Sequence, residues 1–397
     1  MPSKILVLNS GSSSVKYRLF TISDNRAVEP VVGGVIERIG EAGSAVTDHR
    51  AALEGLVRGL ESAGSLRAGE LLAVGHRVVH GGESFDRAVR VDTAVISAIA
   101  AAVPLAPLHN PANLEGIRAC QAHWPAVPQV AVFDTAFHQT MPESAYRYAI
   151  PDAAYTEQGI RRYGFHGTSF ACMVRLMVAY LDRPADSLNL IVLHLGNGAS
   201  ACAIEKGRSI DTSMGMTPMA GLMMGTRCGD LDPGVLLFWL EQQGWSPGDV
   251  SRWLNRESGL KGIAGTNDMR DILQEADHGG SARLALDMYV HRLRHYIGAY
   301  RAQLSRLDAL IFTGGIGEHA APVRSAACRD LSHLGIVLDE SANRAAGKGI
   351  AEIHADSSPV RILIVPTDEE TEIARQTIDL LQAHDSDFSP NIQDHRV

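Results

Sequence analysis

The sequence predicts an α/β protein of two related halves, each built on a mixed β-sheet. Residues 4–20 read as an apolar strand, a short turn of Asn, Gly and Ser, and a second strand in which apolar and charged residues alternate. Residues 190–204 repeat this order half a chain later. Aligning Gly198 with Gly11 also aligns Ser200 with Ser13, so we predict an internal duplication.

The turns of these two hairpins offer backbone N–H groups and hydroxyls, which bind phosphate, and the first hairpin adds Lys16. The first hairpin is not a P-loop, because Lys16 lies inside the second strand and no helix follows directly. One Ser-rich turn alone predicts a plain surface hairpin. Two related turns favour a nucleotide held in a cleft between the halves.

Composition sets the broad class of protein. The chain has 397 residues, enough for two or three domains of about 150 residues each, and its 45% hydrophobic content is ordinary for a soluble protein. The longest apolar runs are too short to span a bilayer, and no secretory signal pattern is present, so no membrane partner is expected. Five scattered cysteines predict reduced thiols and a cytoplasmic location. The net charge of −9 argues against a nucleic-acid partner.

Three polar residues follow predicted strands or precede a predicted helix. Arg77 lies between apolar neighbours near a strand end, where it either pairs with an internal acid or points into a cleft. His109 precedes Asn110, the expected helix N-cap, and helix N-termini favour anions, although an ordinary surface histidine beside a cap fits this pattern somewhat better. Asp134 follows the buried strand 130–133, where open α/β sheets place functional groups.

Three further segments carry candidate chemistry. Glycines surround Arg227, which predicts a loop that approaches another group closely. Residues 308–319 predict a strand, a Gly-rich turn and a helix, which is weak support for a nucleotide site. Thr367 and Glu370 form the pattern of a capping box after a strand. The acids of that first turn either complement the helix dipole or coordinate a metal.

Ten motifs in one order make the chain resemble the acetokinase family, within the actin/sugar-kinase/Hsp70-like superfamily. Among them are Asn-Ser-Gly-Ser-Ser-Ser-Val-Lys at 9–16 and Met-Gly-Thr-Arg-Cys-Gly-Asp-Leu-Asp-Pro at 224–233. The others lie at residues 76–82, 107–111, 133–138, 163–169, 194–198, 268–271, 314–318 and 366–370. The chain departs from the family pattern at Phe170, usually His, and at His319, usually Asn, and the second change bears on nucleotide preference.

The resemblance implies a two-domain actin-like ATPase (ribonuclease H-like) fold with duplicated mixed-sheet domains. Domain I would comprise residues 1–134 plus 369–397, and domain II, residues 135–368, would bind nucleotide and form a homodimer. The implied reaction is a reversible, direct in-line transfer of a phosphoryl group from ATP to acetate, giving ADP and acetyl phosphate. Mg²⁺ would be the cofactor, with Mn²⁺ able to replace it, and the domains would close around substrate.

The resemblance also implies a set of site residues. Catalytic roles would fall to Arg77, His109, Asp134, His166 and Arg227. The acyl group would contact Val79, Leu108, Phe165 and Pro218, with Arg77 holding the carboxylate. Asn9 and Glu369 would bind the metal. The nucleotide would contact Ser12, Ser14, Lys16, His194, Leu195, Gly196, Asn197, Gly198, Asp268, Met269, Arg270, Gly315, Ile316, Gly317, Glu318 and His319.

The role of Asp134 follows from the chemistry of the acceptor. A carboxylic acid with a pKa of about 4–5 is already ionised at neutral pH and needs no general base. We therefore expect Asp134 to orient Arg227 or a metal-bound water rather than to accept a proton.

Two alternatives remain open. A propionate kinase would share nearly every motif, because one methylene is worth only about 1–3 kcal/mol in an apolar pocket. A non-enzymatic actin-like or Hsp70-like nucleotide-binding protein would share the fold. The two arginines beside a small apolar pocket favour small-acid chemistry, and the short segment after the last helix disfavours a chaperone with a peptide-binding domain.

Overall fold

The computed structural model describes residues 3–23, 27–41 and 43–386. The chain divides into two compact units, one comprising Met1–Ala136 with Asp368–Val397 and the other Phe137–Thr367. Within the predicted domain I, residues 387–397 lie outside the described residues. No helix in the described ranges is both long and apolar enough to cross a membrane. All five cysteines belong to those ranges and carry free thiols.

The first unit contains a six-stranded mixed sheet in the order β3-β2-β1-β4-β6-β5. Strands β1, β4 and β6 run parallel to one another, whereas β2, β3 and β5 pair antiparallel with their neighbours. The strands are β1 (Lys4–Ser10), β2 (Ser14–Ile22), β3 (Val28–Glu37), β4 (Leu71–Val78), β5 (Val89–Arg90) and β6 (Gln129–Phe133). The helices are α1 (His49–Ser62), α2 (Thr93–Ala101), α3 (Asn110–His123) and α15 (Glu369–Ser386).

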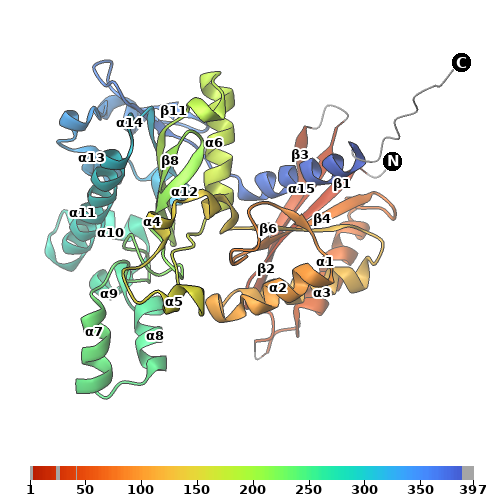
Figure 1. Cartoon of the computed structure of the whole chain (residues 1–397). Helices are drawn as coiled ribbons and strands as arrows, with labels where there is room; N and C mark the ends of the chain where they lie inside the picture. Colours follow the sequence, from red (N-terminus) through yellow and green to blue (C-terminus); the bar gives the residue numbers. More distant parts are fainter. Residues whose placement is uncertain (1–2, 24–26, 42, 387–397) are drawn as a thin grey trace, which may run out of the picture. The chain divides into compact units, whose positions relative to one another are not determined.

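The centre of strand β1, residues 5–8, is apolar because helices cover both faces of the sheet. Leu6 and Leu8 pack in one cluster with the leucines of α1, while Ile5 and Val7 pack in another with Ile373 and its neighbours on α15. Figure 1 shows α15, in blue, on one face of this sheet and α1 to α3 on the other. Helix α15 therefore completes the core to which the first strand contributes.

The second unit repeats this architecture. Its sheet has the order β9-β8-β7-β10-β12-β11, with β7, β10 and β12 parallel and the remaining strands antiparallel to their neighbours. The strands are β7 (Leu190–Leu195), β8 (Ala199–Glu205), β9 (Arg208–Thr212), β10 (Ala309–Thr313), β11 (Ala351–Glu352) and β12 (Arg361–Ile364). Both predicted hairpins, β1–β2 and β7–β8, are confirmed, and the shared strand order confirms the duplicated mixed-sheet fold.

Helices also flank the second sheet on both sides. Phe170 and Met173 of α6 pack against Leu190 and Val192 of β7, and α11 contacts β7 and β8. The helices are α4 (Glu143–Tyr146), α5 (Ala153–Thr156), α6 (Gly167–Leu181), α7 (Pro233–Leu237), α8 (Pro247–Arg256), α9 (Gly259–Ala264), α10 (Met269–Ala276), α11 (Gly280–Gln303), α12 (Gly314–His319), α13 (Ala321–Cys328) and α14 (Glu340–Ala345). Short 3₁₀ turns cover Val103–Leu105, Ala136–Thr140, Ala185–Ser187 and Ser332–Leu334, and a π-helical turn covers Phe238–Gln242.

The topology places each hairpin turn beside the carboxyl ends of the parallel strands. In the first unit, the turn after Ser10 lies at the same edge as Val78 and Phe133, which end β4 and β6. In the second unit, the turn after Leu195 lies at the edge where Thr313 ends β10. The candidate residues of each unit gather at these edges.

Candidate active site

Arg77 and Asp134 form a bidentate ion pair at the strand ends of the first unit. Arg77 Nε donates to Asp134 Oδ1 at 3.0 Å, and Nη2 donates to Oδ2 at 2.6 Å. The Asp134 N–H donates to the Val78 carbonyl at 3.0 Å, which extends the pairing of β6 with β4 by one residue. Of the two possibilities for Arg77, the structure shows the pairing with an internal acid.

Burial and neighbouring charges act in opposite directions on this pair. Burial raises the pKa of Asp134, which is 1% exposed, and the Arg77 guanidinium opposes that rise. Burial disfavours the Arg77 cation, but Asp134, Glu369 and Glu370 outweigh that cost and raise the pKa of Arg77. Arg77 is therefore a permanent cation surrounded by three carboxylates of its own unit.

The first hairpin turn is fixed by helices on its flank. The Gly11 N–H donates to the Ser14 carbonyl at 2.7 Å, and Nε2 of His49 lies 2.8 Å from the Gly11 carbonyl. Asn113 Nδ2 donates to the Ser10 carbonyl at 2.7 Å. His49 and Asn113 were not found by sequence reasoning. Their contacts span long stretches of sequence, so no local pattern could have revealed them.

Lys16 and Glu370 form an ion pair between β2 and the first turn of α15. Lys16 is exposed, whereas Glu370 is largely buried. The lysine is thereby held beside the turn that contains the predicted phosphate-binding residues Ser12 and Ser14. Both serines reach the surface: Ser12 is exposed and Ser14 is half-buried.

Glu369 has the features of a cation ligand. Its Oε1 atom is buried and has no hydrogen-bond partner among the described residues, and its charge acts on Arg77. A buried carboxylate oxygen without a partner is costly unless a cation compensates it. Asn9, half-buried at the end of β1, is the second predicted oxygen ligand.

In the described ranges, no three His, Cys, Asp or Glu side chains converge as a metal cage. Mg²⁺ commonly binds one or two protein oxygens together with water and substrate phosphates. The residues present therefore fit Mg²⁺ better than a metal that requires a complete protein cage.

The remaining predicted residues of the first unit surround the start of α3. His109 occupies the position before this helix, which begins at Asn110 and not at Pro111 as predicted. Instead of capping the helix, the Asn110 side chain accepts from the His80 N–H and donates to its carbonyl. Val79 is buried and Leu108 is exposed.

His166 is the most constrained candidate of the second unit. It precedes α6 in a left-handed conformation, with φ of 57°, which costs free energy for a residue other than glycine. Its Nδ1 lies 2.8 Å from Ser200 Oγ, and its ring stacks on the His194 ring at 4.3 Å. Nδ1 of His194 lies 2.9 Å from Ser169 Oγ, so β7, β8 and α6 together fix both rings.

His166 and Arg227 converge at the second hairpin turn. A Cβ atom placed on Gly198 would lie 3.6 Å from His166 Nε2 and 3.7 Å from Arg227 Nη1. Arg227 Nη1 also donates to the carbonyl of Pro218, a predicted acyl-pocket residue, at 2.8 Å. Because Gly198 has no side chain, space remains between His166 and Arg227. An anionic ligand in this space could accept hydrogen bonds from both.

The predicted nucleotide residues of the second unit occupy three segments. Asn197 Oδ1 accepts from Asn267 at 3.0 Å, and the Asn197 carbonyl accepts from Gly225 at 2.9 Å. Asp268 caps α10 and pairs with Arg270, whose hydrogen bond lowers the pKa of Asp268 to about 2. Helix α12 contains Gly315, Ile316, Gly317, Glu318 and His319.

The structure also corrects the prediction for residues 308–319 and limits the roles of three other predicted residues. Helix α12 begins directly at Gly314, so the expected Gly-rich turn between strand and helix is wrong. Glu318 Oε1 accepts from the Gly314 and Thr367 N–H groups and so holds this helix in place. Leu195, Met269 and Phe165 have buried side chains, so their proposed ligand contacts would come mainly from the backbone.

The two units share one strand order, and each has a small-residue hairpin turn at its parallel-strand edge, which matches the duplicated two-domain fold of acetate kinases. The acetokinase family model matches residues 4–375. The chain belongs to the acetokinase family.

Individual relatives agree with this assignment. The chain is 48% identical to the acetate kinase of Syntrophobacter fumaroxidans, with 96% of this chain and 97% of the relative covered. The crystal structure of Porphyromonas gingivalis acetate kinase is similar with a TM-score of 0.90 and 41% identity, covering 96% of this chain and all of that one. A propionate kinase from Francisella tularensis is similar with a TM-score of 0.88 and 41% identity, covering 95% and 100%.

Proposed function

We propose that the protein is an acetate kinase that transfers the γ-phosphoryl group of ATP reversibly to acetate, giving ADP and acetyl phosphate. The observation that carries this proposal is the similarity to acetate kinases over nearly the whole chain. The positions of Arg77, His166 and Arg227 support it. Both substrates are anions, so catalysis depends on positioning and charge neutralisation.

Arg77 would bind the acetate carboxylate. Its Nε and Nη2 groups are engaged by Asp134, which fixes the plane of the guanidinium, and Nη1 lies on the other edge. A guanidinium of fixed plane binds a carboxylate with less loss of entropy than a flexible cation. Asp134 would thus act by orienting Arg77, a partner that sequence reasoning did not assign to it.

His166 and Arg227 would stabilise the transferring phosphoryl group. Both face the space beside Gly198, where they could donate to equatorial phosphoryl oxygens as charge develops. Asn9 and Glu369 would hold Mg²⁺, or Mn²⁺ in its place. When bound, the metal would neutralise part of the negative charge of the phosphates.

The activity test is acetyl phosphate formation from Mg-ATP and acetate, trapped as the hydroxamate. Arg227→Lys should abolish most product, because lysine keeps the charge but cannot bind phosphoryl oxygens bidentately. Arg183→Lys serves as the matched control, since Arg183 pairs with Asp308 away from the candidate residues. Normal product formation by Arg227→Lys would count against the proposed role.

Two alternatives are tested alongside. The similarity to a propionate kinase supports propionate as a second candidate substrate, with Val79, Leu108, Phe165 and Pro218 forming the acyl pocket. A non-enzymatic filament-forming protein would sediment in the presence of ATP and form no acyl phosphate. We expect the protein to stay in the supernatant and to turn over acetate.

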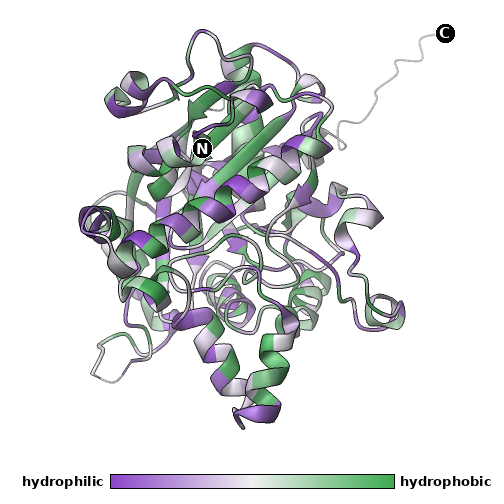
Figure 2. Ribbon diagram, turned by 90° about the vertical axis from the view of Figure 1, so that its left-hand side faces the viewer, coloured by the Kyte–Doolittle hydropathy of each residue, from purple (hydrophilic) through white to green (hydrophobic). Residues whose placement is uncertain are grey.

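We also propose a homodimer formed through the second unit. In the hairpin of α7 and α8, at the bottom of Figure 2, one helix is largely hydrophobic and the other mixes hydrophobic and hydrophilic residues. Six large apolar side chains in this region and on α11 each expose 40–54% of their surface. They are Leu231, Leu237, Phe238, Trp253, Leu284 and Met288. Leu284→Glu should yield a monomer in sedimentation velocity, and an unchanged dimer would exclude this surface.

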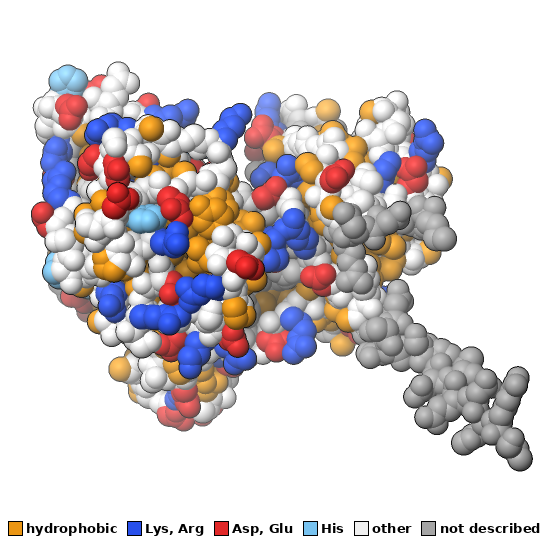
Figure 3. Space-filling view, turned by 90° about the horizontal axis from the view of Figure 1, so that it is seen from above, with side chains coloured by type: hydrophobic (Ala, Val, Ile, Leu, Met, Phe, Trp, Pro, Cys, Tyr) orange, Lys and Arg blue, Asp and Glu red, His pale blue; other side chains and the backbone are white. Residues whose placement is uncertain are grey.

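We further propose a cytoplasmic protein without nucleic-acid or membrane partners. On the face shown in Figure 3, acidic and basic side chains are interspersed. The net charge is −9, and the described helices include no membrane span. Binding to heparin or to anionic vesicles at physiological salt would contradict this part of the proposal.

A further inference from the structure

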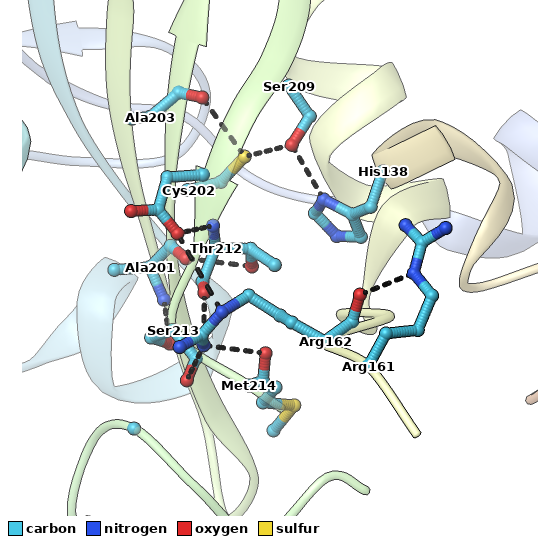
Figure 4. A network of polar contacts seen from close by, with 12 residues as sticks. His138, Arg161, Arg162, Ala201, Cys202, Ala203, Ser209, Thr212, Ser213 and Met214 are labelled. Atoms are coloured by element: carbon cyan, nitrogen blue, oxygen red, sulfur yellow. Dashed lines mark hydrogen bonds and ion pairs between the residues drawn. The ribbon is translucent and has the colours of Figure 1, made fainter. Parts of the chain in front are cut away.

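His138 belongs to a sequence motif, residues 133–138, of which only Asp134 has an assigned role. It lies in the 3₁₀ turn Ala136–Thr140 and is fully buried. Its Nε2 lies 3.0 Å from the Phe165 carbonyl. Its Nδ1 lies 2.8 Å from Ser209 Oγ (Figure 4). One ring thus joins β9 to the residue before His166.

The two contacts define the tautomer. A carbonyl oxygen can only accept, so Nε2 carries the proton and donates to Phe165. Burial lowers the pKa of His138 to about 4, so the ring is neutral at neutral pH and Nδ1 accepts from the Ser209 hydroxyl. Cys202 Sγ lies 3.4 Å from Ser209 Oγ and extends this buried chain.

The ring is held tightly by its surroundings. A Cβ atom on Gly164 would lie only 2.7 Å from His138 Cδ2 and would also clash with Thr212 Cγ2. Phe170 packs against the ring edge-on at a centroid distance of 5.5 Å. Phe170 is itself fully buried, so an apolar ring closes this side of the His138 site.

Contacts along the loop before His166 follow one another in sequence. Arg162 Nη1 donates to the carbonyls of Thr212, Ser213 and Met214 at 2.8–3.1 Å. The Tyr163 and Gly164 N–H groups donate to the Gly215 carbonyl. His138 then holds the Phe165 carbonyl, the last one before the left-handed backbone of His166.

We infer that His138 is a positioning residue for phosphoryl transfer, which fixes the Phe165–His166 peptide and thereby aims the His166 ring. The inference rests on the proposed function, since His166 must act on the phosphoryl group. His138 itself is buried and would touch neither substrate. Misplacement of a reacting group by about 1 Å can lower turnover about 100-fold.

Two substitutions separate the two hydrogen bonds of the ring. His138→Gln places an amide near the Nε2 position and can still donate to Phe165. His138→Asn reaches only the Nδ1 position and can bond Ser209 but not Phe165. We expect the Gln variant to retain most of kcat and the Asn variant to lose about 10- to 100-fold, with the KM for ATP unchanged in both.

Ser209→Ala is the matched control for stability. It removes the Nδ1 partner and leaves the bond to Phe165 intact, so Tm should fall while kcat is maintained. The double variant His138→Gln/Ser209→Ala, which keeps the Phe165 bond alone, should also stay active. A folded but inactive double variant, or equal kcat losses in the Gln and Asn variants that follow their Tm, would overturn the inference.

A double-mutant cycle with His166→Ala tests whether His138 affects turnover through His166. If His138 acts through His166, His138→Asn should cause no further loss of kcat in the His166→Ala background. Additive losses would refute the positioning role. Wild-type protein that forms no acyl phosphate would instead refute the proposed function, so the two failures are distinguishable.

Discussion

Replacing Asp134 by Asn tests how the buried ion pair contributes to turnover. The substitution keeps the shape and one acceptor oxygen but removes the carboxylate that holds Arg77 at 3.0 and 2.6 Å. The charges then nearest to Arg77 are Glu369 and Glu370. We expect the guanidinium to turn toward them, which displaces Arg77 and disturbs the proposed metal ligand Glu369 together.

The structure allows an estimate of the loss in stability and of the loss in turnover. A hydrogen bond between charged groups contributes about 1.5–3 kcal/mol to stability, and the Asp134→Asn variant would lose most of one. The cost should stay below the roughly 3–5 kcal/mol typical for removing one partner of a buried ion pair, because two other acids remain beside Arg77. Loss of orientation should lower kcat by about 100-fold. The KM for acetate should rise by much less than kcat falls, since the displaced Arg77 keeps its charge although it loses its fixed plane.

The assay measures acetyl hydroxamate at saturating Mg-ATP over a range of acetate concentrations, with urea denaturation of the same samples. Asp308→Asn is the matched control. Asp308 is partly buried and accepts from Arg183 at 3.0 Å, away from the candidate residues. It should lose stability but keep turnover. Near-normal kcat for Asp134→Asn, or a rise in the acetate KM matching the fall in kcat, would refute the reasoning.

Three further predictions follow from single contacts. Burial lowers the pKa of both His76 and His138 to about 4, so the folded state binds fewer protons than the unfolded state between about pH 4 and 6.5. The free energy of unfolding should therefore fall as pH drops through this window, by up to about 3 kcal/mol per histidine, and a flat urea-denaturation profile would contradict it. Gly225→Ala should raise the KM for ATP about tenfold, which corresponds to about 1.4 kcal/mol, because the new Cβ would clash with Asn197 Oδ1. An unchanged KM in steady-state kinetics would argue against a role of Asn197 in nucleotide binding. Chelation with EDTA should abolish activity. Glu369→Gln should raise the Mg²⁺ concentration needed for the half-maximal rate, and an unchanged Mg²⁺ dependence would show that Glu369 is not a metal ligand.

Local sequence patterns predicted the parts of the fold that depend on local physics. The hairpins at residues 4–20 and 190–204 were visible because a buried strand, a small-residue turn and an alternating strand each leave a pattern of a few residues. The duplication followed from comparing these two patterns. The positions of Arg77 and Asp134 at strand ends were equally readable, but their pairing was not, because 57 residues separate them.

Helix caps show where local reasoning fails. Thr367 and Glu370 predicted a capping box, but the Asp368 side chain accepts from the Thr371 N–H at 3.0 Å instead. The Thr367 hydroxyl lies 3.0 Å from Ser169 Oγ, a residue 198 positions away. Asn110 likewise bonds His80 rather than capping α3. In each case, the side chain that the local pattern assigned to the helix cap bonds a residue distant in sequence instead.

The central claim is that this chain phosphorylates acetate, and the most direct measurement compares acids in parallel. Acyl hydroxamate formation from Mg-ATP would be followed with acetate, propionate and butyrate, and kcat/KM determined for each. The proposed function predicts the highest kcat/KM with acetate. A higher value with propionate would contradict the choice of substrate, and no acyl phosphate from any acid, despite bound ATP, would contradict carboxylate phosphorylation itself.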